Sequence, residues 1–542
     1  MVQARWGFSR LPQGLGGYHV GMDESHGLWA LFSGAERQHT HISWVWLVGD
    51  WAYKAKRPVQ LPFLDFSTLD ARRHFCVEEL RLNRRTAPGL YLDLWAVCGP
   101  ASAPVLQPWA PDAAWPADGW EVLLRMRRFD QSALWQQRAQ AATLTPGDAD
   151  ALAAHVASFH QGLPPLAQAP ARDTSHWARE SLDGVARHPA RPAWLTLHRV
   201  QALRERVEGA LLALASWRAQ RVAQGWLREG HGDLHLGNLV DWQGRVVAFD
   251  ALEFEPDLRA IDVMNDAAFA FMDLQAHGLP ALAWRFLDGY LAQTGDYAGL
   301  RGLRAFATYR ALVRAKVALL SDAPPEHFER YWTLAERLAA PLPTPQLVLT
   351  MGLSGSGKSS AAALAVEHLA MRGAQNGGPC TGAVRLRSDV ERKRLLGLAP
   401  TDRPGNAVPV DTLYSPDTTR RTYQRLQALT TELLGFGQSV VVDAASLRQA
   451  ERAALRQLAE QAGARFTLLE CVAPAEAMQA RLAQRQAANT DPSDATAAVL
   501  AQQVQWAEPV PADWAPVHRR VVNDGSLDDL RQQVATAMAI EA

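Results

Sequence analysis

A glycine-rich loop set between an apolar strand and a helix places the strongest constraint on the fold of this chain. Residues 347–351 read LVLTM, which is typical of a buried strand, and GLSGSGKS follows at 352–359. The pattern at 360–371 predicts a helix. The loop fits G-x-x-x-x-G-K-S/T, in which glycines let successive backbone N–H groups face phosphate oxygens. The sequence therefore predicts a nucleotide-binding α/β unit over residues 346–542.

The phosphate loop also predicts which groups hold the nucleotide and its metal. Lys358 is expected to reach the outer phosphates, and the Ser359 hydroxyl is expected to bind Mg²⁺. The predicted nucleotide-binding residues are Gly352, Leu353, Ser354, Gly355, Ser356, Gly357, Lys358, Ser359 and Ser360. Further apolar runs at 383–386, 439–442 and 466–471 alternate with helical patterns, which indicates a parallel sheet.

A second phosphate-handling signature lies earlier in the chain. Residues 231–238 read HGDLHLGN, and Asp250 follows a short predicted hairpin. Asp233 and Asn238 have the spacing of a protein-kinase catalytic loop, and Asp250 lies where a metal-binding aspartate is expected. Phosphoryl transfer depends mainly on positioning and on neutralising oxygen charge, which a carboxylate, an amide and a metal can supply.

Lysine is rare in this chain, which makes each lysine informative. Of the 55 basic residues only five are lysines: Lys54, Lys56, Lys316, Lys358 and Lys393. Lysine and arginine are not interchangeable in a crowded phosphate site, because lysine carries a compact ammonium on a slim stem and arginine a broad planar guanidinium. Two strands joined by a Gly-Asp turn are predicted at 42–48 and 51–56, with Lys54 and Lys56 on one face of the second. Both lysines are therefore candidates for nucleotide contacts.

Residues 40–320 resemble the aminoglycoside-phosphotransferase group of the protein-kinase-like superfamily. The resemblance rests on HGDLHLGN and the later Phe249-Asp250. It implies that Asp233 accepts the proton of a substrate hydroxyl, and that Asn238 and Asp250 hold Mg²⁺.

The same resemblance implies a strand lysine paired with a helix glutamate to hold the α- and β-phosphates of the nucleotide. Lys54 or Lys56 fits the strand, and Glu78 or Glu79 fits the helix predicted at 68–85. The sequence leaves both choices open. No G-x-G-x-x-G loop precedes the lysine strand, which is a departure from the protein-kinase pattern.

Residues 346–542 resemble AAA-type P-loop kinases, in particular polynucleotide 5′-hydroxyl kinases and zeta-toxin-like proteins. Beyond the phosphate loop, the matching segments are RSDVER at 387–392, VVDA at 441–444 and two arginines four residues apart on a helix. The roles that the resemblance implies are a base for the acceptor hydroxyl at Asp389, an acceptor-orienting arginine at Arg392, a residue near Mg²⁺ at Asp443, and lid arginines on the transferring phosphate at Arg481 and Arg485.

Length and composition favour a folded protein of several domains. At 542 residues the chain is too long for one core. Apolar residues make up 48% and charged residues 20%, which excludes disorder as the general state. The expected organisation is an unassigned extension at 1–35, a kinase-like α+β domain at 36–338, a Pro-rich linker at 339–345 and a P-loop α/β domain at 346–542.

Charge and cysteine usage narrow the possible partners and compartments. The net charge is −1, which argues against tight nonspecific binding of nucleic acid while leaving room for a local groove. The four cysteines form no C-x-x-C pair, and there is no apolar stretch of the length that a signal peptide or a membrane span needs. A cytoplasmic protein without a membrane partner is expected.

The order of the two halves resembles a bacterial family of fused aminoglycoside-phosphotransferase-like and ATP-binding kinase-like proteins. It implies an ATP- and Mg²⁺-dependent phosphotransferase that acts on a hydroxyl of a small molecule or a nucleotide-like acceptor. Two alternatives stay open: a regulatory, non-catalytic kinase-like half, and a C-terminal half that acts on nucleic-acid 5′ ends. The identity of neither acceptor follows from the sequence.

Overall fold

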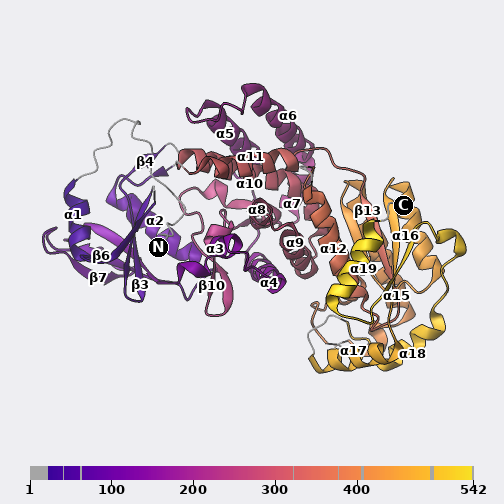
Figure 1. Cartoon of the computed structure of the whole chain (residues 1–542). Helices are drawn as coiled ribbons and strands as arrows, with labels where there is room; N and C mark the ends of the chain where they lie inside the picture. The colour runs from indigo at the N-terminus through magenta and orange to yellow at the C-terminus, as the bar shows by residue number, and fades with distance from the viewer. Residues whose placement is uncertain are drawn as a thin grey trace. The chain divides into compact units, whose positions relative to one another are not determined.

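The chain folds as two compact units (Figure 1). The computed structural model describes residues 22–40, 42–61, 64–321, 323–375, 378–403, 408–488 and 493–539. The first unit extends to Gly278 and includes Ala305–Ala339, and the second comprises Leu279–Arg304 and the chain from Ala340 onward. In the described residues, no helix is long and apolar enough to cross a membrane.

An antiparallel sheet and one helix form the N-terminal part of the first unit. The strand order is β1-β2-β3-β8-β6-β7, and α2 packs against β6 and β8. Thr68 caps α2 by accepting a hydrogen bond from the backbone N–H of Ala71. The elements are α1 (Met22–Leu31), β1 (Glu36–His39), β2 (Ser43–Val48), β3 (Trp51–Lys56), β4 (Gln60–Leu61), β5 (Leu64–Asp65), α2 (Leu69–Asn83), β6 (Tyr91–Cys98), β7 (Val105–Trp109) and β8 (Glu121–Arg127).

The rest of the first unit is mainly helical and carries the HGDLHLGN motif on a loop. Its elements are α3 (Trp135–Gln140), α4 (Pro146–Gly162), α5 (Thr174–Arg187), α6 (Leu197–Ala213), α7 (Ala215–Ala223), β9 (Leu227–Glu229), β10 (Leu239–Trp242), β11 (Arg245–Ala248), β12 (Ala260–Asp262), α8 (Val263–Ala276) and α11 (Pro325–Leu338), together with the part of α10 (Leu300–Leu320) from Ala305 onward. The two-residue turn between β10 and β11 is Gln243-Gly244, and both residues have positive φ, as tight hairpins favour. An α+β unit with an antiparallel sheet followed by helices is thus present, as the sequence predicts.

A five-stranded parallel sheet forms the core of the second unit. Its order is β14-β15-β13-β16-β17, which places the strand before the phosphate loop at the centre. The elements are α9 (Pro280–Thr294), β13 (Gln346–Met351), α12 (Lys358–Ala374), β14 (Ala383–Arg387), α13 (Ser388–Leu395), α14 (Val410–Leu413), α15 (Pro416–Gly435), β15 (Ser439–Asp443), α16 (Gln449–Gln461), β16 (Arg465–Val472), α17 (Ala475–Ala488), α18 (Ala497–Trp506), β17 (His518–Val522) and α19 (Leu527–Ala539). This confirms the predicted parallel α/β fold.

One segment belongs to a different unit from the one suggested by the sequence boundaries. Residues 279–304 fall inside the range 36–338 that the sequence assigns to the kinase-like domain, yet they pack with the P-loop unit. Helix α9 contacts α12 and β14. The Pro-rich segment at 341–345 has no regular structure and precedes β13. The P-loop unit is therefore built from two separate stretches of sequence.

Candidate active sites

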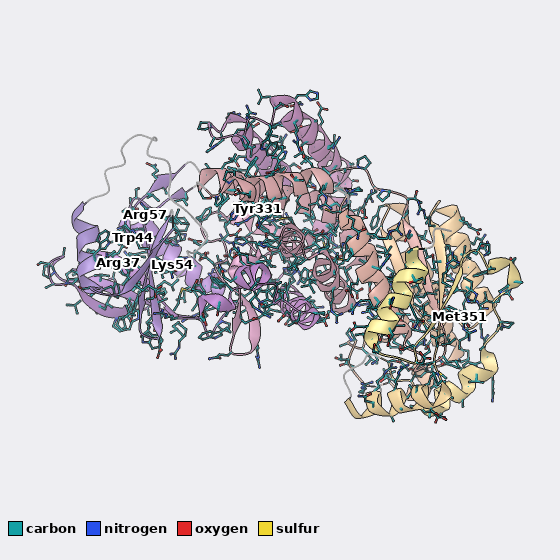
Figure 2. All side chains as sticks on the ribbon, in the orientation of Figure 1. Arg37, Trp44, Lys54, Arg57, Tyr331 and Met351 are labelled. Atoms are coloured by element: carbon teal, nitrogen blue, oxygen red, sulfur yellow. The ribbon has the colours of Figure 1, made fainter. Side chains whose placement is uncertain are left out.

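A network of ion pairs joins the lysine strand, helix α2 and Asp250 in the first unit. Lys54 lies on β3 in the antiparallel sheet (Figure 2). Its Nζ donates to Glu79 Oε1 and to Asp250 Oδ1, each at 2.7 Å. Glu78, the neighbouring candidate on the helix, pairs with Arg81 instead. Burial disfavours the charged form of Lys54, but the carboxylates outweigh this and raise its pKa.

Lys56 shares the same glutamate but lies deeper in the protein. Its Nζ donates to Glu79 Oε2 at 2.7 Å and also to Glu253 Oε1. Burial would raise the pKa of Glu79, yet the two lysines outweigh burial and hold this pKa below its usual range. The Lys56 side chain is 1% exposed and that of Lys54 is 13% exposed. Of the two candidates, Lys54 is thus the one that a nucleotide can reach more readily.

We expect Lys54→Met and Lys56→Met to have different consequences. Lys54→Met should weaken nucleotide binding at this site by about tenfold or more, the size expected for one charge-assisted hydrogen bond. Lys56→Met should instead lower the free energy of unfolding by about 3 kcal/mol, because it leaves buried Glu253 without its cation. Titration with a fluorescent ATP analogue and thermal melting measure the two effects. Equal, small losses of affinity in both variants would refute the assignment of Lys54.

Asp233 and Asn238 meet at the loop between β9 and β10. Asn238 Nδ2 donates to Asp233 O at 2.9 Å and to Asp233 Oδ2 at 3.0 Å. His235 Nε2 lies 3.4 Å from the same carboxylate oxygen. Burial would raise the pKa of Asp233, but His235 and Arg314 outweigh burial and lower it to about 2. The carboxylate is therefore ionised at neutral pH, as a proton acceptor must be.

Asp250 follows the β10–β11 hairpin in a left-handed backbone conformation. Its φ is 59°, which costs a non-glycine residue on the order of 1 kcal/mol or more. Its backbone N–H donates to Tyr91 Oη at 3.2 Å. With this backbone, the carboxylate faces Lys54 and remains 39% exposed.

Two aspartates of α8, which no sequence motif indicated, hold the HGDLHLGN loop through its backbone N–H groups. Asp266 accepts hydrogen bonds from the backbone N–H groups of His231 and Gly232, at 2.7 and 3.0 Å. Asp273 accepts one from the backbone N–H of Leu236 at 2.8 Å and one from the Tyr331 hydroxyl at 2.7 Å. Both carboxylates are buried on a helix that is otherwise mostly apolar. Two acids seven residues apart in such a helix are the signal that could have identified them.

The phosphate loop of the second unit requires glycine where the backbone is crowded. At Gly352, with φ 147°, a Cβ would lie 2.3 Å from the carbonyl oxygen of Cys471. At Gly357, with φ 94°, it would lie 1.9 Å from Asn523 Nδ2. Lys358 begins α12, and its Nζ donates to the carbonyl oxygen of Leu353 at 2.8 Å. Burial lowers the pKa of Lys358.

Ser359 and Asp443 meet at the C-terminal end of the parallel sheet. Ser359 Oγ donates to Asp443 Oδ1 at 3.2 Å. Asp443 ends β15 and is 5% exposed, and its Oδ2 accepts no hydrogen bond from the described residues. A buried carboxylate oxygen that accepts no hydrogen bond is a candidate ligand for a cation.

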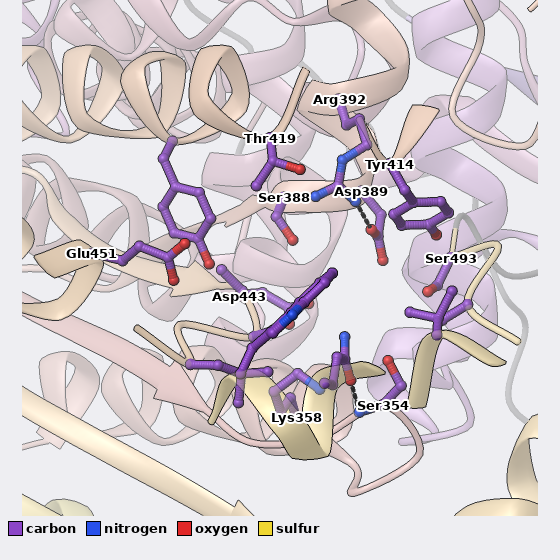
Figure 3. Close-up of a pocket in the computed structure, with 18 of the residues that line it drawn as sticks. Ser354, Lys358, Ser388, Asp389, Arg392, Tyr414, Thr419, Asp443, Glu451 and Ser493 are labelled. Carbon is purple, nitrogen blue, oxygen red and sulfur yellow. Dashed lines mark hydrogen bonds and ion pairs between the residues drawn. The ribbon is translucent and has the colours of Figure 1, made fainter. Parts of the chain in front are cut away.

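Asp389 and Arg392 lie across a cavity from the phosphate loop (Figure 3). Arg392 Nη1 donates to Asp389 Oδ1 at 2.8 Å, and the guanidinium stacks on the Tyr414 ring at 5.0 Å from its centroid. The cavity of about 550 Å³ is also lined by Ser354, Gly355, Gly357, Lys358, Ser359, Asp443 and Arg485. The volume is in the usual range for a small-molecule site.

Arg481 and Arg485, which have the same predicted role, make different contacts in the structure. Arg485 lines the cavity, whereas Arg481 is held by the carbonyl oxygens of Gly355 and Asn523, at 3.3 and 3.0 Å. Ser360 lies on the first turn of α12 and is exposed to solvent. Arg485 therefore lies at the cavity wall, whereas Arg481 is hydrogen-bonded to the backbone of the phosphate loop, and a role for either arginine at the phosphates stays a prediction.

Helix α18 supplies cavity residues that no motif predicted. Gln503 Oε1 accepts a hydrogen bond from the backbone N–H of Ser354 at 2.7 Å, and Trp506 lines the same cavity. Figure 3 shows Ser354 beside Lys358 at the loop side of the cavity. Neither residue belongs to a charged pattern or a glycine-rich segment, so the sequence alone offered no signal for them.

Both candidate sites contain side chains of the kinds that bind Mg²⁺ in kinases. Within the described parts of the chain, no three His, Cys, Asp or Glu side chains gather as a metal-binding group. Mg²⁺ in kinases is commonly held by one or two carboxylates together with phosphate oxygens and water. Asp250 and Asn238 in the first unit, and Asp443 and Ser359 in the second, match that requirement.

Comparison with known proteins gives matches on both parts of the chain. An AAA domain family model matches residues 347–510. The APS kinase CysC of Mycobacterium tuberculosis is similar with 25% identity and a TM-score of 0.26, over 36% of this chain and 98% of that one. A choline/ethanolamine kinase family protein from Mesorhizobium loti is similar with 15% identity and a TM-score of 0.37, over 59% of this chain and 95% of that one.

A curated relative matches almost the whole length. The uncharacterized protein Rv2004c of Mycobacterium tuberculosis is 30% identical over 497 residues, which are 89% of this chain and 91% of the relative. The chain therefore belongs to the same family as Rv2004c, with a kinase-like α+β unit joined to a P-loop α/β unit.

Proposed function

We propose that this protein is an ATP- and Mg²⁺-dependent phosphotransferase with two kinase-type sites, each of which phosphorylates a hydroxyl of a small molecule or a nucleotide-like acceptor. The observation that carries the proposal is that one cavity is lined by Lys358, Ser359, Asp443, Asp389 and Arg392. These side chains supply a phosphate-binding cation, a metal site, and a base with an adjacent arginine. All three are needed for in-line transfer of a phosphoryl group.

At the P-loop site, Asp389 accepts the proton of the acceptor hydroxyl while the new O–P bond forms and the bond between the transferred phosphorus and the ADP oxygen breaks. Arg392 holds the acceptor, and its contact with Asp389 fixes the direction of the carboxylate. Lys358 neutralises charge on the phosphates, with Arg485 as a second cation at the cavity wall. Bound Mg-ATP supplies the phosphoryl group and the charge of the metal.

At the kinase-like site, different residues would bind the phosphates, bind the metal and accept the proton. Lys54, oriented by Glu79, would hold the phosphates of the nucleotide, and Asn238 with Asp250 would hold the metal. Asp233 is ionised and takes the acceptor proton. Support for this assignment comes from the contacts of Lys54 with both Glu79 and Asp250.

The acceptors are proposed to be small. The P-loop cavity has a volume of about 550 Å³ and mixes carboxylates, arginines and amides with the rings of Tyr414, Tyr423 and Trp506. This lining suits a compact polar molecule that can donate and accept hydrogen bonds. Action on nucleic-acid 5′ ends is the competing possibility, and the net charge of −1 does not favour a polymer.

A screen with labelled ATP tests the proposal on the full chain. Three forms are compared: the wild type, Lys358→Ala and Asp233→Asn. Each is incubated with pools of hydroxylated metabolites or with 5′-hydroxyl oligonucleotides. We expect some pools of small molecules to be labelled by the wild type and by only one of the two variants, which assigns each acceptor to its site. Labelling of oligonucleotides alone would establish the nucleic-acid alternative, and no labelling that depends on either residue would refute the proposal.

A further inference from the structure

Helix α9 covers the edge strand of the P-loop sheet, although its sequence precedes that sheet by many residues. It contacts β14 and α12. Gly382 lies so close to α9 that a Cβ there would be 2.4 Å from Trp284 Cε2. Arg394 Nη2 donates to the carbonyl oxygen of Ala292 at 2.7 Å. Helices often cover the exposed edge of a sheet. In addition, Asp288 of α9 makes hydrogen bonds to a residue of the edge strand.

Asp288 of α9 binds the backbone and the side chain of the same residue on β14. Its Oδ1 accepts a hydrogen bond from the backbone N–H of Arg385 at 2.9 Å. Its Oδ2 accepts two from the guanidinium, from Nε at 3.1 Å and from Nη2 at 3.0 Å. The two side chains are only 11% and 15% exposed. The backbone N–H therefore holds the Asp288 carboxylate, and two hydrogen bonds to that carboxylate fix the guanidinium in one orientation.

The remaining guanidinium nitrogen of Arg385 points to the candidate metal site. Its Nη1 donates to the carbonyl oxygen of Ser359 at 3.1 Å and lies 3.8 Å from Asp443 Oδ2. That oxygen is the one that accepts no hydrogen bond from the described residues. Arg387 Nε also faces it, at 3.5 Å. Arg385 and Arg387 thus lie at ion-pair distance from Asp443 Oδ2, but neither makes a hydrogen bond to it.

We propose that Asp288 is a positioning residue of the P-loop site, which keeps Arg385 from making a hydrogen bond to Asp443, so that Asp443 Oδ2 stays available to Mg²⁺. This inference rests on the proposed function of the site as a Mg-ATP kinase. Asp288 and Asp443 are the two carboxylates whose charges act most strongly on Arg385. If Asp288 loses its charge, the buried guanidinium keeps Asp443 as its strong anionic neighbour, and a closer, hydrogen-bonded Arg385–Asp443 pair competes with the metal.

Competition between Arg385 and Mg²⁺ for Asp443 predicts an effect on Mg²⁺ binding that a purely structural role of Asp288 does not predict. Asp288→Asn should raise the Mg²⁺ concentration for half-maximal ATP binding by about tenfold, the size of one coupled pair of buried charges. The double variant Asp288→Asn/Arg385→Gln should restore the wild-type Mg²⁺ requirement, because it also removes the competing cation. Asp528→Asn, which breaks the ion pair with Arg531 on α19, is the matched control and should change nothing.

The measurement is a MgCl₂ titration of the binding of a fluorescent ATP analogue to the full chain. All forms carry Lys54→Met to weaken binding at the kinase-like site, and circular dichroism checks that each is folded. If Asp288→Asn fails to fold, the single variant Arg385→Gln tests the inference. Its Mg²⁺ requirement should be no higher than that of the parent, and a higher requirement would overturn the inference. An unchanged requirement in Asp288→Asn, or a raised one that the double variant does not restore, overturns the inference. Binding in the parent that Lys358→Ala leaves intact would refute the proposed function itself.

Discussion

Asp389→Asn is expected to leave Mg-ATP binding at the P-loop site nearly unchanged and to lower phosphoryl transfer by about 10²–10⁴-fold, the usual share of a general base. Asparagine keeps the shape of the side chain and can still accept a hydrogen bond from Arg392. It cannot take the proton of the acceptor hydroxyl. Nucleotide titration and single-turnover transfer to the acceptor found in the screen separate the two effects.

The control for Asp389→Asn is the exposed Asp528→Asn variant, which should transfer at the wild-type rate. Retention of full transfer by Asp389→Asn would remove this residue from the mechanism. Asp443 would then be the next candidate for the base, because it lines the same cavity.

Asp233→Asn should have an effect of similar size at the kinase-like site, about 10²–10⁴-fold on turnover with little change in Mg-ATP affinity. The reason is that the carboxylate, whose pKa is lowered to about 2, is the ionised group beside Asn238 in the catalytic loop. Initial rates with the acceptor assigned to this site measure it, in a Lys358→Ala background that silences the other site.

Asp183→Asn, on the exposed face of α5, is the matched control for Asp233→Asn. If Asp233→Asn and the control turn over equally, the kinase-like unit does not catalyse transfer. A regulatory role, in which this unit binds a ligand without turnover, would then replace the catalytic one.

Local sequence patterns correctly predicted the features that depend on a single helix, strand or loop. The LVLTM strand, the phosphate loop and the following helix are present as expected, because each is specified by contiguous residues. The short hairpin predicted before Asp250 is present as well. Placing Lys54 and Lys56 on one face of a strand followed from the two-residue period of strands.

What the sequence left open depends on contacts between distant residues. Glu78 and Glu79 are neighbours, and only the packing of α2 on the sheet determines that Glu79 meets Lys54. Arg481 has the spacing of a phosphate-binding arginine, and its hydrogen bonds to the carbonyl oxygens of Gly355 and Asn523 could not be read from that spacing. The assignment of α9 to the P-loop unit likewise arises from packing over a long separation in sequence.

The central claim is that one chain carries two separate Mg-ATP sites, and the stoichiometry of nucleotide binding tests it most directly. Isothermal titration of the full chain with a non-hydrolysable ATP analogue in Mg²⁺ should give two binding events per chain. Lys358→Ala should abolish one event, Lys54→Met should weaken the other, and the double variant should show neither at the affinity of the wild type. A single event in the wild type that Lys358→Ala removes completely would contradict the account, because the kinase-like unit would then bind no nucleotide.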